Sequence, residues 1–212
     1  MSNALRHVFA AELRKLATLP AVHSTVAITV LATPALALAA GFRAVEYGRL
    51  GLILLGILTA AGEYSGSQLR TSLLSVPNRP LLLSVKVLAY LAVATPTTLL
   101  TVALSTVAAE EPGAALPGTT VYLVVIGLLA LAVAVLLRSV VGAVATLVTL
   151  VFVVSPLLAA ATDVAEYLPD RAGASLYRPG VLSAGEGGAV MAAWLVITFA
   201  VTVITFTKRD AR

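Results

Sequence analysis

The sequence contains few of the side chains that carry out chemistry, and their spacing does not form a catalytic or metal site. The chain has 212 residues with no cysteine, and its two histidines, His7 and His23, both lie near the N-terminus. Neither has a second histidine at the spacing of a zinc protease, and no serine lies in a nucleophile elbow with a histidine downstream. We therefore expect no catalytic residue and no metal ligand in this chain.

Paired carboxylates and phosphate loops are the next chemistry to consider. Glu110 and Glu111 are adjacent, but the Pro-Gly that follows them predicts a solvated turn rather than a catalytic dyad. The sequence has no Gly-x-x-x-x-Gly-Lys-Ser/Thr motif, whose backbone would hold the phosphates of a nucleotide. We expect the chain itself to bind no cofactor and to hydrolyse no nucleotide.

The polar segment 62–80 has the most informative spacing. Ser65 is followed three residues later by Gln68, which is the capping-box pattern of a helix N-terminus. An apolar stripe then recurs at helical spacing before Pro77 ends the helix. Its members are Leu69, Leu73 and Val76. The segment is predicted to form a short helix at the membrane surface, which either contacts a partner or simply connects two spans.

Residues 1–19 have the pattern of an amphipathic helix. The apolar residues recur at helical spacing and the basic residues lie on the other side. The apolar positions are Leu5, Val8, Phe9, Leu13 and Leu16, and the basic ones are Arg6, Arg14 and Lys15. Glu12 interrupts the apolar stripe. Either its side chain reaches the surface or pairs with Lys15 one turn later, or this edge of the helix faces protein rather than lipid.

The composition places the rest of the chain in a membrane. Hydrophobic residues make up 59% of the sequence and charged residues 11%, with a mean hydropathy of +1.01. A soluble domain carries about a quarter of its residues charged, so the deficit excludes that class. Six apolar blocks stand out, at 21–40, 50–61, 81–109, 119–137, 140–161 and 189–206. The fold class is therefore predicted to be an all-α integral membrane protein of about six spans, with residues 1–212 in one transmembrane domain.

The distribution of basic residues predicts the orientation. With the N-terminus inside, ten of the 14 Lys and Arg residues fall on the inner side and four on the outer side. The outer four are Arg43, Arg49, Arg171 and Arg178, while Lys86 is expected to extend from the third block to the inner surface. The positive-inside rule then places both termini in the cytoplasm and the chain in the inner membrane. Because the basic residues are scattered, nucleic acid is not an expected partner.

Hydroxyl groups are the main polar groups within the apolar blocks. One set shares a face of the third block and the other a face of the sixth. They are Thr98, Thr101 and Ser105, and Thr198, Thr202 and Thr205. Such groups usually serve helix packing or bond to the preceding turn, and the alternative is a weakly polar wall of a pathway for amphipathic cargo.

The segment 162–188 before the last block contains Pro169, Gly173, Pro179 and Gly180. These residues divide it into short pieces. They predict either small helices that re-enter the outer leaflet or an extended loop. The run that begins at Pro34 is similar to a signal-peptidase site, but its apolar block is long for a signal sequence.

The order of these features resembles that of type-2 ABC exporter permeases. Residues 62–79 followed by Lys86 resemble the cytoplasmic loop of that family, and residues 11–16 resemble its N-terminal elbow helix. The resemblance implies a coupling helix between spans two and three that contacts a separate ATPase, which would bind ATP and magnesium. The implied coupling residues are Glu63, Tyr64, Gln68, Leu69, Arg70, Leu73 and Val76, and the implied elbow residues are Glu12, Arg14 and Lys15.

The resemblance also implies a second permease half, and a homodimer is expected. Ala35 with Ala39, and Gly188 with Ala192, offer small-residue faces for close helix approach. Because no apolar block carries a carboxylate, uphill transport would take its energy from another polypeptide. The function expected is export of an amphipathic or lipophilic substrate such as a peptide, antibiotic or lipid. The alternatives are a docking, immunity or sensor subunit that transports nothing, and an intramembrane enzyme, which the missing nucleophile, base and metal ligands disfavour.

Overall fold

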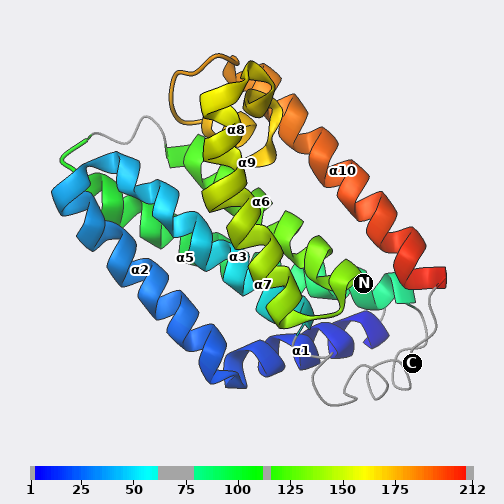
Figure 1. The fold of residues 1–212 in the computed structure, drawn as a ribbon. Coiled ribbons are helices and arrows are strands. Elements are labelled where there is room, and N and C mark those ends of the chain that lie inside the picture. The colour runs from blue at the N-terminus through cyan, green and yellow to red at the C-terminus, as the bar shows by residue number, and fades with distance from the viewer. Residues whose placement is uncertain (1–2, 62–78, 112–115, 209–212) are drawn as a thin grey trace.

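The computed structural model describes residues 3–61, 79–111 and 116–208, and these residues form helices and short connections with no strand among them (Figure 1). The predicted coupling helix falls within 62–78 and lies outside the described residues. An all-α membrane protein is the class that the composition predicted, and the helical content and apolar helices of the structure agree with it.

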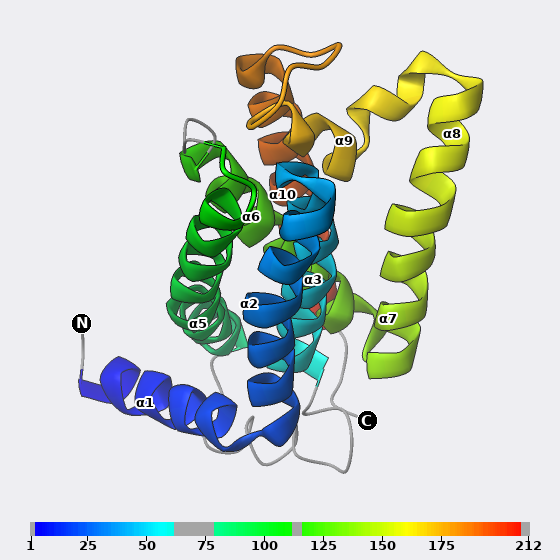
Figure 2. The ribbon, with the colours of Figure 1, turned by 90° about the vertical axis from the view of Figure 1, so that its left-hand side faces the viewer.

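The first part of the chain consists of a transverse helix and two antiparallel helices. Helix α1 (Asn3–Thr18) lies across one end of the bundle, and α2 (Pro20–Ala40) runs along it (Figure 2). Gly41 has a φ of 67°, a conformation that favours glycine, and it ends α2. The short helix η1 (Phe42–Ala44) then leads into α3 (Val45–Ala61), which returns along the bundle.

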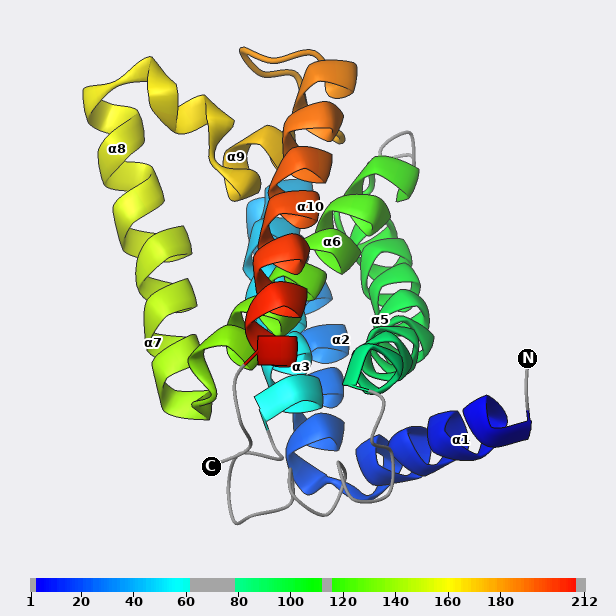
Figure 3. The same ribbon diagram turned by 90° about the vertical axis from the view of Figure 1, so that its right-hand side faces the viewer.

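The second part of the chain adds four more lengths of helix. Helix α5 (Arg79–Ala108) and helix α6 (Leu116–Leu137) form an antiparallel pair. The third length is divided into α7 (Val140–Thr149), the π-helix η2 (Leu150–Val154) and α8 (Ser155–Ala161). After η3 (Asp163–Tyr167) and α9 (Pro169–Ala174), helix α10 (Ala184–Lys208) returns to the end crossed by α1 (Figure 3).

Five helical segments of the described chain are long and apolar enough to cross a membrane. They are Pro20–Ala40, Pro80–Ala108, Leu116–Leu137, Val140–Ala161 and Ala184–Phe206. The expected number was about six. The remaining predicted block, 50–61, belongs to α3, which begins earlier than predicted, at Val45. Helix α3 has 17 residues and is shorter than each of the five segments.

The centre of the bundle is the contact of α3 and α5 with α6, the most buried of the five. Gly127 on α6 allows this contact, because a Cβ there would collide with the Tyr90 hydroxyl of α5 and lie 2.6 Å from the Leu52 carbonyl oxygen of α3. Tyr90 is fully buried and donates a hydrogen bond to the Val124 carbonyl at 3.1 Å. Close backbone approach at a small residue is typical of helix packing in membranes.

The segment before the last span forms small helices rather than an extended loop. Ala172 and Asp170 of α9 are buried, and Gly173 lies against the Tyr122 ring of α6 and the Met191 sulfur of α10. We call the end of the bundle that contains η1, η3 and α9 the far end. Its residues fold back onto α3, α6 and α10, and α1 lies at the opposite end (Figure 3).

Candidate functional site

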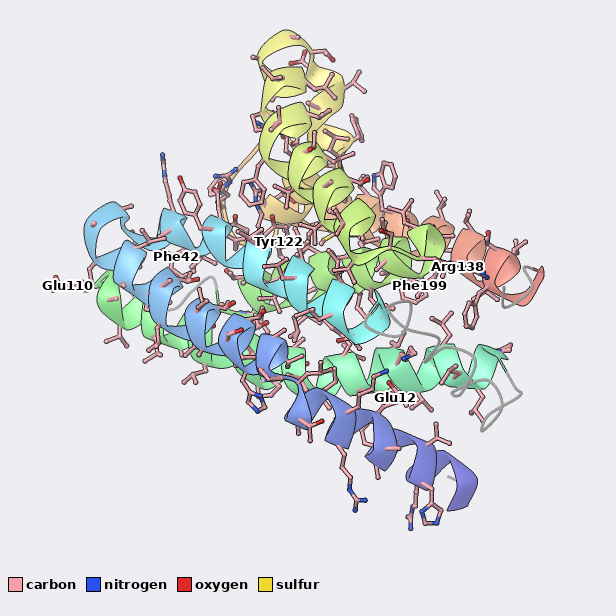
Figure 4. All side chains as sticks on the ribbon, turned by 60° about the horizontal axis from the view of Figure 1, so that its bottom comes forward. Glu12, Phe42, Glu110, Tyr122, Arg138 and Phe199 are labelled. Atoms are coloured by element: carbon pink, nitrogen blue, oxygen red, sulfur yellow. The ribbon has the colours of Figure 1, made fainter. Side chains whose placement is uncertain are left out.

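Helix α1 is joined to α5 by a buried ion pair. The Lys86 ammonium nitrogen lies 3.0 Å from Oε2 of Glu12, and the two side chains are 4% and 9% exposed. Figure 4 shows Glu12 between the two helices. The expectation that Lys86 extends to the inner surface is therefore wrong, because its ammonium group is held within the protein by a carboxylate on another helix.

The other elbow residues have different environments. Leu16 is buried beside Glu12, Phe9 and Leu13 are partly buried against the core, and Arg14 is exposed. The edge of α1 that contains Glu12 thus faces protein rather than lipid. Lys15 is partly buried. The helical periodicity alone left open whether this edge of α1 faces lipid or protein. The packing of Glu12 and Leu16 decides between the two.

All the residues implied in ATPase coupling lie outside the described residues. These are Glu63, Tyr64, Gln68, Leu69, Arg70, Leu73 and Val76. Their role stays a prediction. The structure does place Lys86 only seven residues after Arg79, where α5 begins. The helix that directly follows the predicted coupling segment is therefore the one that binds α1.

The hydroxyl groups of the third block are buried inside the bundle. Thr98, Thr101 and Ser105 are 0% exposed, and Thr101 donates a hydrogen bond to the Thr97 carbonyl at 2.8 Å. None of these three residues lines the cavities described below. Their burial is consistent with a role in packing.

The hydroxyl groups of the sixth block are less uniform. Thr202 is buried and donates to the Thr198 carbonyl at 2.7 Å and to the Ala132 carbonyl of α6 at 3.3 Å. Thr198 and Thr205 are partly buried. Thr202 therefore attaches α10 to α6, and a pathway role for this set remains a prediction.

A cluster of charged residues lies at the far end. Arg49, which was predicted to lie on the outer side, is part of helix α3, and its side chain is 13% exposed. Its Nη1 atom is 3.6 Å from Oδ2 of Asp170 on α9. The same Asp170 oxygen accepts a 2.6 Å hydrogen bond from the Ser155 hydroxyl of α8. The Arg49 guanidinium also lies 4.6 Å from the centroid of the Phe152 ring.

Two further ion pairs surround this buried pair. Arg178 forms an ion pair with Glu46 of α3, and Arg171 Nη1 lies 3.1 Å from Glu166 Oε1. Both pairs are less buried than Arg49 with Asp170. Because buried charges cost free energy unless they are paired, the pair of Arg49 and Asp170 requires α3 and α9 to stay in contact.

Two adjacent cavities lie among these charged residues. The larger one has a volume of about 560 Å³ and the smaller about 90 Å³, and Glu46, Arg171, Ala174, Tyr177 and Arg178 line both. Arg49, Ser155 and Asp170 line only the smaller cavity. Phe42 lines only the larger one, and its ring meets the Tyr177 ring edge-on with 6.4 Å between the ring centroids.

The environment of the far-end cluster raises the pKa values of two of its side chains. Burial raises the pKa of the Asp170 carboxyl above its ordinary value, while the Ser155 hydrogen bond and the Arg49 charge act in the opposite direction. Burial also raises the pKa of the Tyr177 hydroxyl. Both shifts follow from enclosing groups in a poorly solvated pocket.

Sequence reasoning missed this cluster. Asp170 was included only in the segment 162–188, and its contact with Arg49 depends on the folding of α9 against α3. The available signal was an acidic residue directly after Pro169, at a predicted helix start. In the described parts of the chain, no group of three or more His, Cys, Asp and Glu side chains could hold a metal ion.

Comparison with known proteins adds no assignment. The chain matches no protein-family model and no curated protein.

Proposed function

We propose that this chain is the membrane-spanning subunit of an ATP-driven exporter in the inner membrane. In this proposal it has six spans, which are α3 and the five longer helical segments, and both termini lie in the cytoplasm. A separate ATPase subunit binds ATP and magnesium and docks on the segment 62–80. A second copy of the chain completes the permease, and the cargo is amphipathic or lipophilic.

The observation that carries the proposal is the buried pair of Glu12 and Lys86. A partner that moves residues 62–78 acts directly on α5, because α5 begins at Arg79. The ion pair of 3.0 Å transfers that movement to α1, since separating it would leave two charges buried and unpaired. A helix that only rests on the membrane surface needs no such connection to the bundle.

The distribution of charges supports an external source of energy. Residues 116–137 and 140–161 contain no Asp, Glu, Lys or Arg, and Lys86 and Arg49 lie within the first third of their helices. Carriers driven by protons or sodium ions bind the coupling ion near the midplane with ionisable groups or broken helices. The central parts of these spans offer no ionisable group for that purpose.

Exposed small residues support the second copy. Ala35 and Ala39 are exposed on α2 and lie four residues apart, so they share one face. A helix from a second chain can approach closely at such a face. Mass measurement of the complex in lipid nanodiscs is expected to give two permease chains, and a single chain would contradict the dimer.

The test of the proposal is reconstitution with the ATPase encoded by a neighbouring reading frame. The two proteins are co-expressed, purified together and placed in nanodiscs, where the rate of ATP hydrolysis is measured with and without the permease. We expect stable co-purification and a rate that depends on the permease. Co-purification with an unchanged rate would favour the docking or sensor alternative, and no association would contradict both.

A further inference from the structure

Four buried polar atoms around the smaller far-end cavity have no hydrogen-bond partner within the described part of the protein. They are Nε of Arg49, Oδ1 of Asp170, Nε of Arg171 and the hydroxyl oxygen of Tyr177. Asp170 is 3% exposed, so its free carboxylate oxygen is almost completely enclosed. Buried polar atoms are nearly always hydrogen-bonded in folded proteins, so their concentration at one cavity requires a cause.

The chemistry of these atoms defines what they can bind. Two of them donate, the carboxylate oxygen accepts, and the Tyr177 hydroxyl can do either. A group that both donates and accepts hydrogen bonds, such as an amide or a hydroxyl, can therefore satisfy them. The cavity volume of about 90 Å³ is the space of roughly three water molecules, which suits one such group.

The charge of the two cavities disfavours an ion. Their lining contains four arginines and four carboxylates, so its formal charge is zero. The arginines are Arg43, Arg49, Arg171 and Arg178, and the acidic residues are Glu46, Glu111, Glu166 and Asp170. The smaller cavity by itself is lined by three of these arginines and two of these carboxylates, so a cation there would meet an excess of like charge. An anion could not donate the hydrogen bond that Oδ1 of Asp170 lacks, and either ion would lose hydration, which costs free energy. A neutral polar group avoids this cost.

The larger cavity supplies the apolar contact. Phe42, Pro179, Val181 and Leu182 line it, and five of its lining residues also line the smaller cavity. A volume of about 560 Å³ lies within the range of small-molecule sites. A molecule with a polar group in the smaller cavity would thus place its apolar part against these side chains.

We propose that the far end is a binding site for an uncharged amphipathic molecule that carries amide or hydroxyl groups. The polar group occupies the smaller cavity, next to Asp170 and Arg49. The proposed site can be tested independently of the proposed export function, because ligand binding is measured on the full chain without ATP or an ATPase. Failure of ATPase coupling and failure of ligand binding are therefore separate results.

The chain contains its own reporter of binding. Trp194 is the single tryptophan, and its indole nitrogen donates a 2.9 Å hydrogen bond to the Tyr167 carbonyl of η3. This bond connects α10 to the segment that forms the cavities. Binding at the far end is expected to change the fluorescence of Trp194, and isothermal titration calorimetry provides a second, direct measurement.

The experiment compares three leucine derivatives that differ in charge. N-acetyl-leucinamide is neutral, N-acetyl-leucine is an anion at neutral pH, and leucinamide is a cation. The full chain in nanodiscs is titrated with each probe, and empty nanodiscs correct for partition into lipid. We expect saturable binding of the neutral probe, at least about tenfold tighter than either ion. Equal or tighter binding of an ion, or no saturable signal by either method, would overturn the proposal.

Three variants locate the binding. Tyr177→Phe removes one unpartnered hydroxyl and is expected to weaken the neutral probe by about fivefold. Ala174→Leu places a larger side chain between both cavities and is expected to abolish saturable binding. Tyr47→Phe is the matched control, because Tyr47 is 60% exposed and lines neither cavity. Thermal unfolding verifies that each variant is folded, and tight binding by folded Ala174→Leu would contradict the site.

Discussion

The ammonium nitrogen of Lys86 lies 3.0 Å from the carboxylate of Glu12, although 74 residues separate them in the sequence. This pair attaches α1 to α5 inside the protein. Through this ion pair, α1 packs as a part of the bundle rather than as a separate surface helix.

Removing one partner of this pair should destabilise the protein more than removing both. Glu12→Gln or Lys86→Met leaves a buried charge unpaired, which should cost about 3 kcal/mol of unfolding free energy. The double variant Glu12→Leu with Lys86→Met should recover most of that loss. Chemical unfolding in detergent measures the three values, with Arg14→Gln on the exposed side of α1 as the control. Equal losses for the single and double variants would show that the pair itself is unimportant.

The predicted coupling helix can be tested without knowledge of its structure. Leu73→Asp would bury an unpaired charge in the ATPase contact and should abolish co-purification of the ATPase. Arg70→Glu should weaken it less, because a rim charge affects orientation and rate more than affinity. Both variants should insert normally, since the positions lie outside the five helices that are long and apolar enough to cross a membrane. A Leu73→Asp chain that retains the ATPase and its stimulated hydrolysis would identify the segment as a connector.

Close packing at the centre of the bundle predicts a strong effect at one glycine. Gly127→Ala introduces a Cβ that collides with the Tyr90 hydroxyl and the Leu52 carbonyl, and it should cost about 1–3 kcal/mol. Gly185→Ala is the control, because a Cβ there has no heavy atom within 4 Å. Unfolding followed by circular dichroism compares the two. A neutral Gly127→Ala would mean that α3 and α6 pack less closely than described.

The proposed orientation can be tested with single cysteines, because the chain has none of its own. Gly180 is exposed at the far end, so a Gly180→Cys variant should react with an impermeant maleimide in intact cells. Asn78→Cys lies on the proposed cytoplasmic side and should react only after permeabilisation. The opposite pattern of labelling would reverse the orientation of the chain.

The raised pKa of Asp170 predicts a pH effect of defined sign. Because the folded chain holds this proton more tightly than the unfolded chain does, the contribution to stability increases as pH falls through the folded pKa toward the ordinary value of about 3.9. The Asp170→Asn variant has no such proton. The stability of the natural chain relative to Asp170→Asn should therefore rise between about pH 7 and about pH 4. A constant difference across this interval would contradict the effect of burial.

The amino-acid sequence was sufficient for the helical membrane class and for most helix positions. Hydropathy and the spacing of apolar residues are local properties, so the blocks 21–40 and 140–161 correspond closely to α2 and to the α7–η2–α8 length. The start of α3 shows why helix boundaries were harder to predict. A helix end depends on local turns, and α3 begins at Val45, whereas the predicted apolar block began at residue 50.

The tertiary structure decided which side chains meet. The pairing of Lys86 with Glu12, and of Arg49 with Asp170, depends on how each helix is rotated about its axis and which neighbour it packs against. Periodicity in one sequence gives the faces of a helix but not the partner of each face. For the same reason the sequence alone indicated Ala35 with Ala39 as a close-packing face, but it did not indicate the close internal contact at Gly127, where α3, α5 and α6 converge.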